Sequence, residues 1–249
     1  MLEVKQEDGI LKVWLNRPTH RNALDTETLD EIYGLFSGLE RRFDVRAVVL
    51  AGRGPSFCAG ADRKHPPCAA PSDADEREAR WVSQAGLRAC RAIADCEVVT
   101  IAKLHGHVIG GGFGLAVSCD FRVASRDATF SLPEVDLGVP IAWGAVPRLV
   151  SELGAAKARE LSILCDTIDA REAERINLVQ RVVDRSDLDS ITDGLARRII
   201  EKPVMAVHMA KTSFRAMTNG MVDPTHADGE LFVSGMHSAA GRENFPDVY

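Results

Sequence analysis

Residues 105–138 read HGHVIGGGFGLAVSCDFRVASRDATFSLPEVDLG. Gly110, Gly111 and Gly112 open an apolar segment that predicts a helix, and two short strands and an acidic residue, Glu134, follow. The first N–H groups of a helix have no partner inside it and lie at the positive end of its dipole. The stretch therefore predicts backbone donors at the glycine turn beside a carboxylate. The alternatives are a helix that packs closely on a strand without any ligand, and a surface glutamate.

The composition is that of an ordinary globular protein. The chain has 249 residues, of which 45% are hydrophobic and 27% charged. This length suits one large domain, or one domain with a small appendage. With 36 acidic against 30 basic residues the formal charge is -6, and no basic patch stands out. We therefore expect no nucleic-acid partner.

Targeting and metal signals are not found in the sequence. The N-terminal residues lack the basic and apolar regions of a signal peptide, and no apolar run is long enough to span a bilayer. The cysteines form no C-x-x-C pair and the histidines no H-E-x-x-H motif. We expect a cytoplasmic protein with reduced thiols, no membrane partner and no metal site.

Strands and helices are predicted to alternate over the first half of the chain. Asp8 and Gly9 mark a turn between two strands within residues 2–16, and Leu29 to Phe43 recur at helical spacing. The further predicted elements are helices over residues 25–43 and 75–94, and strands over residues 47–51, 97–104, 120–124 and 129–131. This alternation predicts an α/β domain.

The second half is predicted to be mainly helical. Helices are expected over residues 155–164, 170–176, 188–201, 204–219 and 225–240, with one strand over 178–183. The segment of the last two predicted helices is rich in apolar side chains, which must pack on the chain's own core or on another subunit. These residues are Met205, Met209, Phe214, Met217, Met221, Leu231, Phe232 and Met236. Residues 63–80 are polar and rich in proline, so they predict a mobile surface loop, either a lid or a plain connector.

A second glycine-bearing turn follows the apolar strand at 47–51. It contains Ala59, Gly60, Ala61 and Asp62. Two such turns could direct two N–H groups at one oxygen, as in an oxyanion hole that stabilises a thioester enolate. A carboxylate flanked by apolar residues, such as Glu134, could have a raised pKa that suits proton transfer.

Other catalytic classes lack their motifs. Neither G-x-G-x-x-G, G-x-x-x-x-G-K-[ST] nor G-x-S-x-G occurs in the sequence. A nicotinamide-dependent oxidoreductase is therefore a remote alternative.

Taken together, the motifs resemble the crotonase, or enoyl-CoA hydratase/isomerase, family over essentially the whole length. Each motif is weak alone, but their order and spacing are specific. They are Asn16-Arg17-Pro18 with Asn22-Ala23-Leu24, residues 46–50, residues 57–62, residues 105–112, residues 119–124, residues 130–138, Arg148-Leu149 and residues 170–183.

The resemblance implies an α/β fold, a crotonase-like spiral of ββα units over residues 1–185, with a helical region over 186–249 that makes homotrimers or homohexamers. It implies an acyl-CoA thioester as substrate and no separate cofactor, since coenzyme A is part of the substrate. By position, the N–H groups of Ala61 and Gly111 should form the oxyanion hole. The family's acyl-CoA contacts fall on Ala23, Ala59, Asp62 and Arg63, to which we add Gly110 and Trp143.

The match departs from the family at two informative places. Family hydratases hold water between two glutamates; Glu134 matches the second, but Gly114 stands where the first should be. Trp143 lies in an altered glycine-rich segment and either narrows the acyl pocket or fills core. We therefore expect an enolate enzyme with Glu134 as single acid/base, isomerising a double bond rather than hydrating efficiently. A hydratase that uses Glu134 alone and a non-catalytic acyl-CoA binder are the alternatives.

Overall fold

The computed structural model describes residues 1–67, 69–70, 72–219, 228–237 and 242–243, with side chains left out at 217–219, 228 and 230–232. The first sheet has the order β1-β2-β3-β4-β6-β9, and the second has the order β5-β7-β8. All neighbours in the first sheet are parallel except β1 and β2, which form a hairpin through Asp8 and Gly9. This confirms the predicted α/β class.

The strands of the first sheet are β1 (Leu2–Glu7), β2 (Ile10–Leu15), β3 (Ala47–Gly52), β4 (Val99–Leu104), β6 (Phe121–Ser125) and β9 (Arg181–Val183). Every residue of β3 is buried, which fits a parallel strand covered on both faces. On β3, Val48 and Leu50 face the larger core while Ala47 and Val49 face the smaller one. The alternation along this strand therefore separates the two cores.

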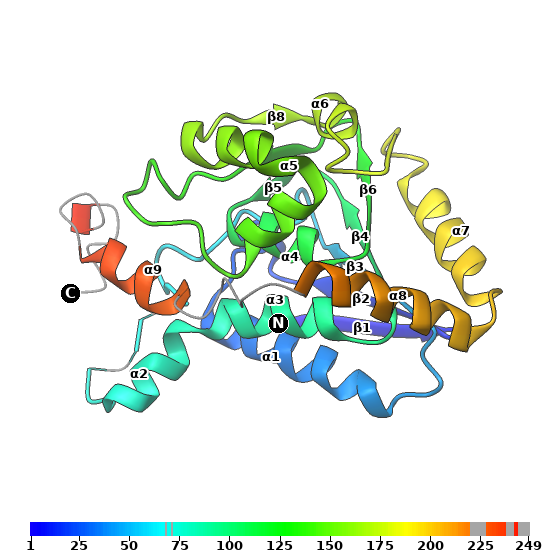
Figure 1. Cartoon of the computed structure of the whole chain (residues 1–249), viewed down its shortest axis with the longest axis horizontal. Coiled ribbons are helices and arrows are strands. Elements are labelled where there is room, and N and C mark those ends of the chain that lie inside the picture. Colours follow the sequence, from blue (N-terminus) through cyan, green and yellow to red (C-terminus); the bar gives the residue numbers. More distant parts are fainter. Residues whose placement is uncertain (68, 71, 220–227, 238–241, 244–249) are drawn as a thin grey trace.

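Helices cover both faces of this sheet (Figure 1). On the larger-core side lie α1 (Thr26–Gly38), α3 (Ala85–Asp95) and α4 (Gly111–Ser118), which pack on one another. On the other side α7 (Leu188–Ile200) packs Leu188 and Ala196 against the sheet. The predicted boundary at residue 185 thus precedes a helix that completes the core, and the division into two regions stays a prediction.

The second sheet is small and supports the glycine turn. Its strands are β5 (His107–Ile109), β7 (Thr129–Ser131) and β8 (Ile168–Asp169). β5 and β8 were not predicted from the sequence, because two or three residues carry no periodic signal. In the larger core Phe113 of α4 meets Phe130 of β7 edge to face, with ring centroids 6.2 Å apart. This contact fixes α4 over the small sheet.

Three predicted helices have different bounds in the structure, and one of them, predicted over 155–164, begins at Ala145. The helix predicted over 25–43 ends at Gly38, and a short 3-10 turn (Leu39–Arg41) follows. Phe43 is therefore not a core residue: it is 91% exposed. The helix predicted over 75–94 is interrupted at Gln84 between α2 (Glu76–Ser83) and α3, so residues 76–80 of the predicted loop are helical.

The remaining helices are α5 (Ala145–Leu164), which is kinked at Gly154, α6 (Ala170–Arg175), α8 (Val204–Asn219) and α9 (Asp228–Met236). In α9, Met236 is buried beside Val139, so part of the tail packs on the chain's own core. In α8, Met205, Met209 and Phe214 are exposed. Of the other predicted tail residues, Met217, Met221, Leu231 and Phe232 lie outside the described side chains. None of the described helices is long and apolar enough to span a membrane.

Candidate active site

The glycine turn is the junction between β5 and α4. Gly110 has φ 52° and ψ −118°, a conformation that favours glycine, and its N–H donates to the carbonyl of Ser131 at 3.0 Å. Gly111 is the first residue of α4. Within the described residues, the N–H of Gly111 has no acceptor, as expected for the first turn of a helix. A donor is therefore present where the sequence predicted one.

The second predicted donor, Ala61, lies in a loop that contacts this turn. The N–H of Leu24 donates to Gly60 and the N–H of Asp62 donates to Leu24, each at 2.8 Å. The N–H of Ala61 lies between these two bonds and meets no acceptor in the part of the chain that the structure describes. A Cβ on Gly60 would lie 3.0 Å from the carbonyl oxygen of Ile109 and 3.8 Å from the nitrogen of Gly111. The structure thus brings the segments of both predicted donors together.

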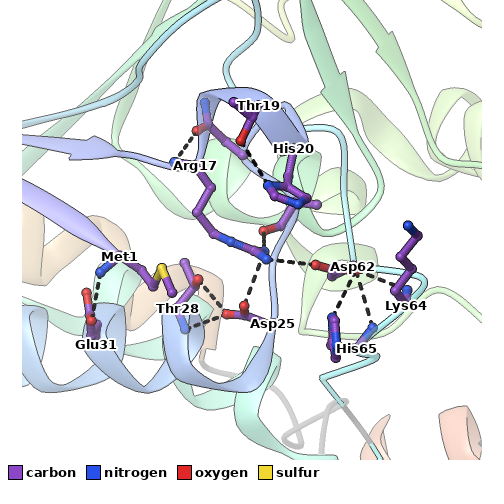
Figure 2. A network of polar contacts seen from close by, with 12 residues as sticks. Met1, Arg17, Thr19, His20, Asp25, Thr28, Glu31, Asp62, Lys64 and His65 are labelled. Atoms are coloured by element: carbon purple, nitrogen blue, oxygen red, sulfur yellow. Dashed lines mark hydrogen bonds and ion pairs between the residues drawn. The ribbon is translucent and has the colours of Figure 1, made fainter.

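A buried ion pair positions the loop of Ala61 (Figure 2). Arg17 Nη2 donates to Asp62 Oδ2 at 2.9 Å, and Arg17 Nη1 lies 3.2 Å from Asp25 Oδ2. Asp62 also accepts from the backbone N–H groups of Lys64 and His65. The side chain of Asp62 therefore binds Arg17 and the following turn, and the predicted contact of this residue with coenzyme A, chiefly through the backbone, stays a prediction.

Asn22 supports the same loop from the other side. Its Nδ2 donates to the carbonyls of Arg53, Ser56 and Phe57, and its Oδ1 accepts from the N–H of Arg17. Arg17 and Asn22 belong to the quoted family motifs, but the sequence predicted no role for either. Each binds a residue far along the chain: Asp62 lies 45 residues after Arg17, and Arg53 lies 31 residues after Asn22.

The remaining predicted coenzyme A contacts surround this loop. Ala59 and Ala23 are half-buried, and the N–H of Ala59 donates to Arg21, two residues before Ala23. Arg63 is exposed directly after Asp62. Ala23, Ala59, Asp62 and Arg63 therefore lie in or next to this loop. Their contact with coenzyme A stays a prediction.

Glu134 lies in the loop after β7, on the other side of the glycine turn. Its Oε2 is buried and has no hydrogen-bond partner in the described chain, although part of the residue is exposed. A Cβ on Gly110 would lie 3.0 Å from Glu134 Oε1, so the carboxyl is directly against the turn. Burial raises the pKa of Glu134 to about 7. A carboxyl with this pKa can both take and return a proton near neutral pH.

Trp143 and Gly114 complete the surroundings. A Cβ on Gly111 would lie 2.1 Å from Cζ3 of Trp143, so the indole lies against the turn as well. Gly114, on the next turn of α4, is buried and has Cys90 and Trp143 as its neighbours. No second carboxylate stands at this position.

A large hollow lies at the opposite end of α4 and is not part of this site. Its volume is about 1220 Å³, and α5, α7 and α8 contribute to its walls. Neither Glu134 nor Trp143 lines it. The hollow is thus separate from the carboxyl and from the free N–H groups.

Comparison with known proteins places the chain in a family. Residues 5–245 match the family described as enoyl-CoA hydratase/isomerase. The chain is 34% identical over 219 residues to the short-chain-enoyl-CoA hydratase of Clostridium acetobutylicum, covering 88% of this chain and 81% of that protein. It is 33% identical over 210 residues to the peroxisomal Delta(3,5)-Delta(2,4)-dienoyl-CoA isomerase of Arabidopsis thaliana, covering 81% and 75%.

Solved structures agree with this assignment. The crystal structure of a putative enoyl-CoA hydratase from Streptomyces coelicolor A3(2) superposes with a TM-score of 0.81 at 34% identity, covering 94% of this chain and 84% of that one. The chain therefore belongs to the enoyl-CoA hydratase/isomerase family and has the crotonase fold. It is an acyl-CoA enzyme of this family, a lyase or an isomerase.

Proposed function

We propose that the protein moves a double bond within an enoyl-CoA thioester and that Glu134 is its single acid/base. The observation that carries the proposal is the buried Glu134 carboxyl, with Oε2 unpartnered, beside a turn at which the second carboxylate is replaced by Gly114. The relatives include proteins named hydratases and one named an isomerase. The missing second carboxylate favours the isomerase chemistry for this chain.

The reaction follows from the positions of the groups. The carboxylate of Glu134 removes a proton from C2 of a 3-enoyl thioester, and the electron pair moves into the thioester carbonyl. The N–H groups of Ala61 and Gly111 stabilise the oxygen of this dienolate. The protonated carboxyl then returns the proton at C4, and the double bond becomes C2=C3. One carboxyl suffices, because no atom other than the proton is transferred.

Hydration is the second candidate. It ranks below isomerisation because it needs a further group that orients and deprotonates water. A general acid–base group contributes about a hundred- to ten-thousand-fold to rate, so a hydratase without the second carboxylate would be slow. Glu134 could still serve as both base and acid for a weak hydratase.

The test supplies purified protein with 2-butenoyl-CoA and 3-butenoyl-CoA in parallel. We expect isomerisation of the 3-enoyl thioester to be the faster reaction, and we expect Glu134→Gln to slow it by about a hundredfold or more. Hydration that exceeds isomerisation and survives Glu134→Gln would refute the proposal. Calorimetric binding of a CoA ester without turnover of any substrate would instead identify a non-catalytic acyl-CoA binder.

We further propose that the chain forms a homotrimer or homohexamer through its helical tail. Phe214, Met209 and Met205 on α8 are 76%, 65% and 64% exposed, and such apolar side chains on one helix favour a partner surface. Phe214→Asp should lower the mass measured by light scattering towards that of a 27.1 kDa monomer. An unchanged mass would place the interface elsewhere. The cytoplasmic location stays a prediction.

A further inference from the structure

Trp143 is held in a slot formed by glycines of two helices. A Cβ on Gly86 of α3 would lie 2.0 Å from Cε2 of the indole, and one on Gly111 of α4 would lie 2.1 Å from Cζ3. Real Cβ contacts are never this short, so no larger residue fits at either position while the indole is in place. The ring therefore lies between the backbones of α3 and α4.

The backbone of Trp143 is in a conformation that tryptophan rarely adopts. Its φ is 60°, and the following Gly144 also has a left-handed conformation. L-residues other than asparagine, aspartate and histidine seldom adopt this region, and such residues persist where the surroundings hold them. The glycines that line the slot provide this support. Trp143, in the segment before α5, therefore keeps a large ring at a backbone position that favours glycine.

The Glu134 carboxyl and the Trp143 indole lie against two successive residues of the glycine turn, Gly110 and Gly111. A Cβ on Gly110 would lie 3.0 Å from Glu134 Oε1, and one on Gly111 would lie 2.1 Å from Cζ3 of the indole. An acyl group whose thioester oxygen binds the Gly111 N–H would thus have the carboxyl and the indole as its neighbours. The ring supplies no base, because an indole N–H donates a hydrogen bond but accepts none.

The indole also borders the place of the missing glutamate. A Cβ on Gly114 would lie 3.9 Å from Cε3 of Trp143 and 3.7 Å from Cys90 Sγ, which are ordinary contacts. An alanine would fit there, but a longer side chain directed towards the turn would meet the ring. Outside α4 itself, the atoms within 4 Å of such a Cβ are therefore carbon and sulfur, which are poor partners for a water.

We propose that Trp143 is the specificity-determining residue that directs the reaction to isomerisation by excluding water from the acyl group beside Gly114. This inference rests on the proposed enolate chemistry of Glu134. Without water at C3, the proton on Glu134 returns only to carbon, at C2 or C4, and no oxygen is added. Gly114 and Trp143 then act together, because Gly114 supplies no carboxylate and Trp143 keeps water from the place beside it.

The test measures the ratio of hydration to isomerisation with 2-butenoyl-CoA and 3-butenoyl-CoA. The variants are Trp143→Gly, Gly114→Glu and the double variant. Glycine is chosen because it adopts φ 60° without strain. Trp81→Ala is the control for loss of an indole, since Trp81 lies on α2 and is 54% exposed.

We expect Trp143→Gly to raise the ratio about tenfold, because water then reaches the site but only Glu134 serves it. Gly114→Glu alone should leave the ratio unchanged, since the ring blocks the new side chain. The double variant should raise it about a hundred-fold or more, beyond the product of the single changes. Trp81→Ala should behave as the wild type.

The outcomes separate this inference from the proposed function. An isomerising wild type whose ratio is unchanged in Trp143→Gly would overturn the inference and leave the role of Glu134 intact. A wild type without isomerisation, whose Trp143→Gly variant hydrates, would refute the proposed function; it would support the exclusion of water by Trp143 and overturn its direction of the reaction to isomerisation. If Trp143→Gly does not fold, Gly114→Glu decides alone, because a rise in hydration with Trp143 in place would overturn the inference.

Discussion

Arg17 Nη2 donates to Asp62 Oδ2 at 2.9 Å across 45 residues of sequence, and the two side chains are only 13% and 8% exposed. The pair joins the turn after β2 to the loop that carries Ala61. A buried charge that loses its partner is costly, so this contact controls both the stability of the loop and the position of the Ala61 N–H.

Arg17→Met should therefore affect stability and catalysis together. Because Asp62 and Asp25 would both lose their cation, we expect the free energy of unfolding to fall by about 3–5 kcal/mol. Displacement of one oxyanion donor should lower kcat/KM by about a hundredfold to a thousandfold. Urea unfolding and isomerisation kinetics measure the two effects.

The exposed pair of Arg42 and Asp44 is a matched control, with side chains 43% and 56% exposed and an N–O distance of 2.9 Å. Arg42→Met should change the free energy of unfolding by no more than about 1 kcal/mol. Equal losses in the two variants would show that burial does not distinguish the pairs.

The pH dependence of activity should report Glu134. Since burial raises its pKa to about 7, its base form is incomplete at neutral pH. We expect kcat/KM for isomerisation to rise with pH through about 7 and then level off. A profile that is already flat from pH 5 to 8 would contradict the assignment of Glu134 as base. A stopped assay over this range measures it.

The same carboxyl should destabilise the fold when it is ionised. Its pKa is about 7 in the folded protein against an ordinary 4.5, so between these values the folded protein binds more protons than the unfolded chain. The free energy of unfolding therefore falls as pH rises from 4.5 to 7, by at most about 3 kcal/mol. Glu134→Gln should remove this fall and be the more stable protein at pH 8, while its activity drops by about a hundredfold or more. Denaturant unfolding at pH 5 and pH 8 compares the two proteins.

Sequence patterns predicted those parts of the fold that depend on local periodicity. β3 was evident because all its residues are apolar, and α1 because its apolar residues recur at helical spacing. The structure adds that Asp25 caps α1, its side chain accepting from the N–H of Thr28 at 2.9 Å. The interruption at Gln84 and the exposure of Phe43 were not evident. Residues 75–94 keep helical spacing through the break, and Phe43 continues the apolar spacing of α1 beyond its end. Tertiary packing decides such cases, and periodicity does not record it.

Some residues of the candidate site could be predicted from the sequence and others could not. Gly110, Gly111 and Glu134 belong to one continuous stretch, so their sequence alone indicated a donor turn with a carboxylate. The slot of Trp143 joins residues 86 and 111 to residue 143, and nothing in the spacing of these residues shows that they meet. The sequence therefore left two roles open for Trp143, and only the three-dimensional arrangement relates it to Gly114.

His105 should reduce stability in acid. It is buried at the end of β4, its Nε2 lies 3.0 Å from the carbonyl oxygen of Gly54, and its Nδ1 has no partner among the described residues. Burial, with a smaller contribution from Arg185, lowers the pKa of His105 to about 4. Between pH 4 and 6.5 the unfolded chain binds more protons, so the free energy of unfolding falls as pH decreases through this window, by at most about 3 kcal/mol.

His105→Gln should lack this acid-dependent loss, because glutamine does not titrate. His65→Gln is the control, since the side chain of His65 is 76% exposed. Denaturant unfolding at pH 4.5 and 6.5 measures both. An identical pH dependence in wild type and His105→Gln would show that another group is responsible.

Gly110→Ala should damage the site more than the fold. The new Cβ would lie 3.0 Å from Glu134 Oε1, and alanine is strained at φ 52° and ψ −118°. We expect the free energy of unfolding to fall by about 1–3 kcal/mol because of this strain. Displacement of the carboxyl from the acyl group should lower the isomerisation rate by about a hundredfold.

The control is Gly34→Ala, because Gly34 lies inside α1 with nothing within 4 Å of a new Cβ. That change should stabilise the protein by about 0.5–1 kcal/mol and leave the rate unaltered, since alanine favours a helix interior. Thermal unfolding and isomerisation kinetics on the two variants measure both effects. A Gly110→Ala protein with the wild-type rate would show that the carboxyl does not depend on close contact with the turn.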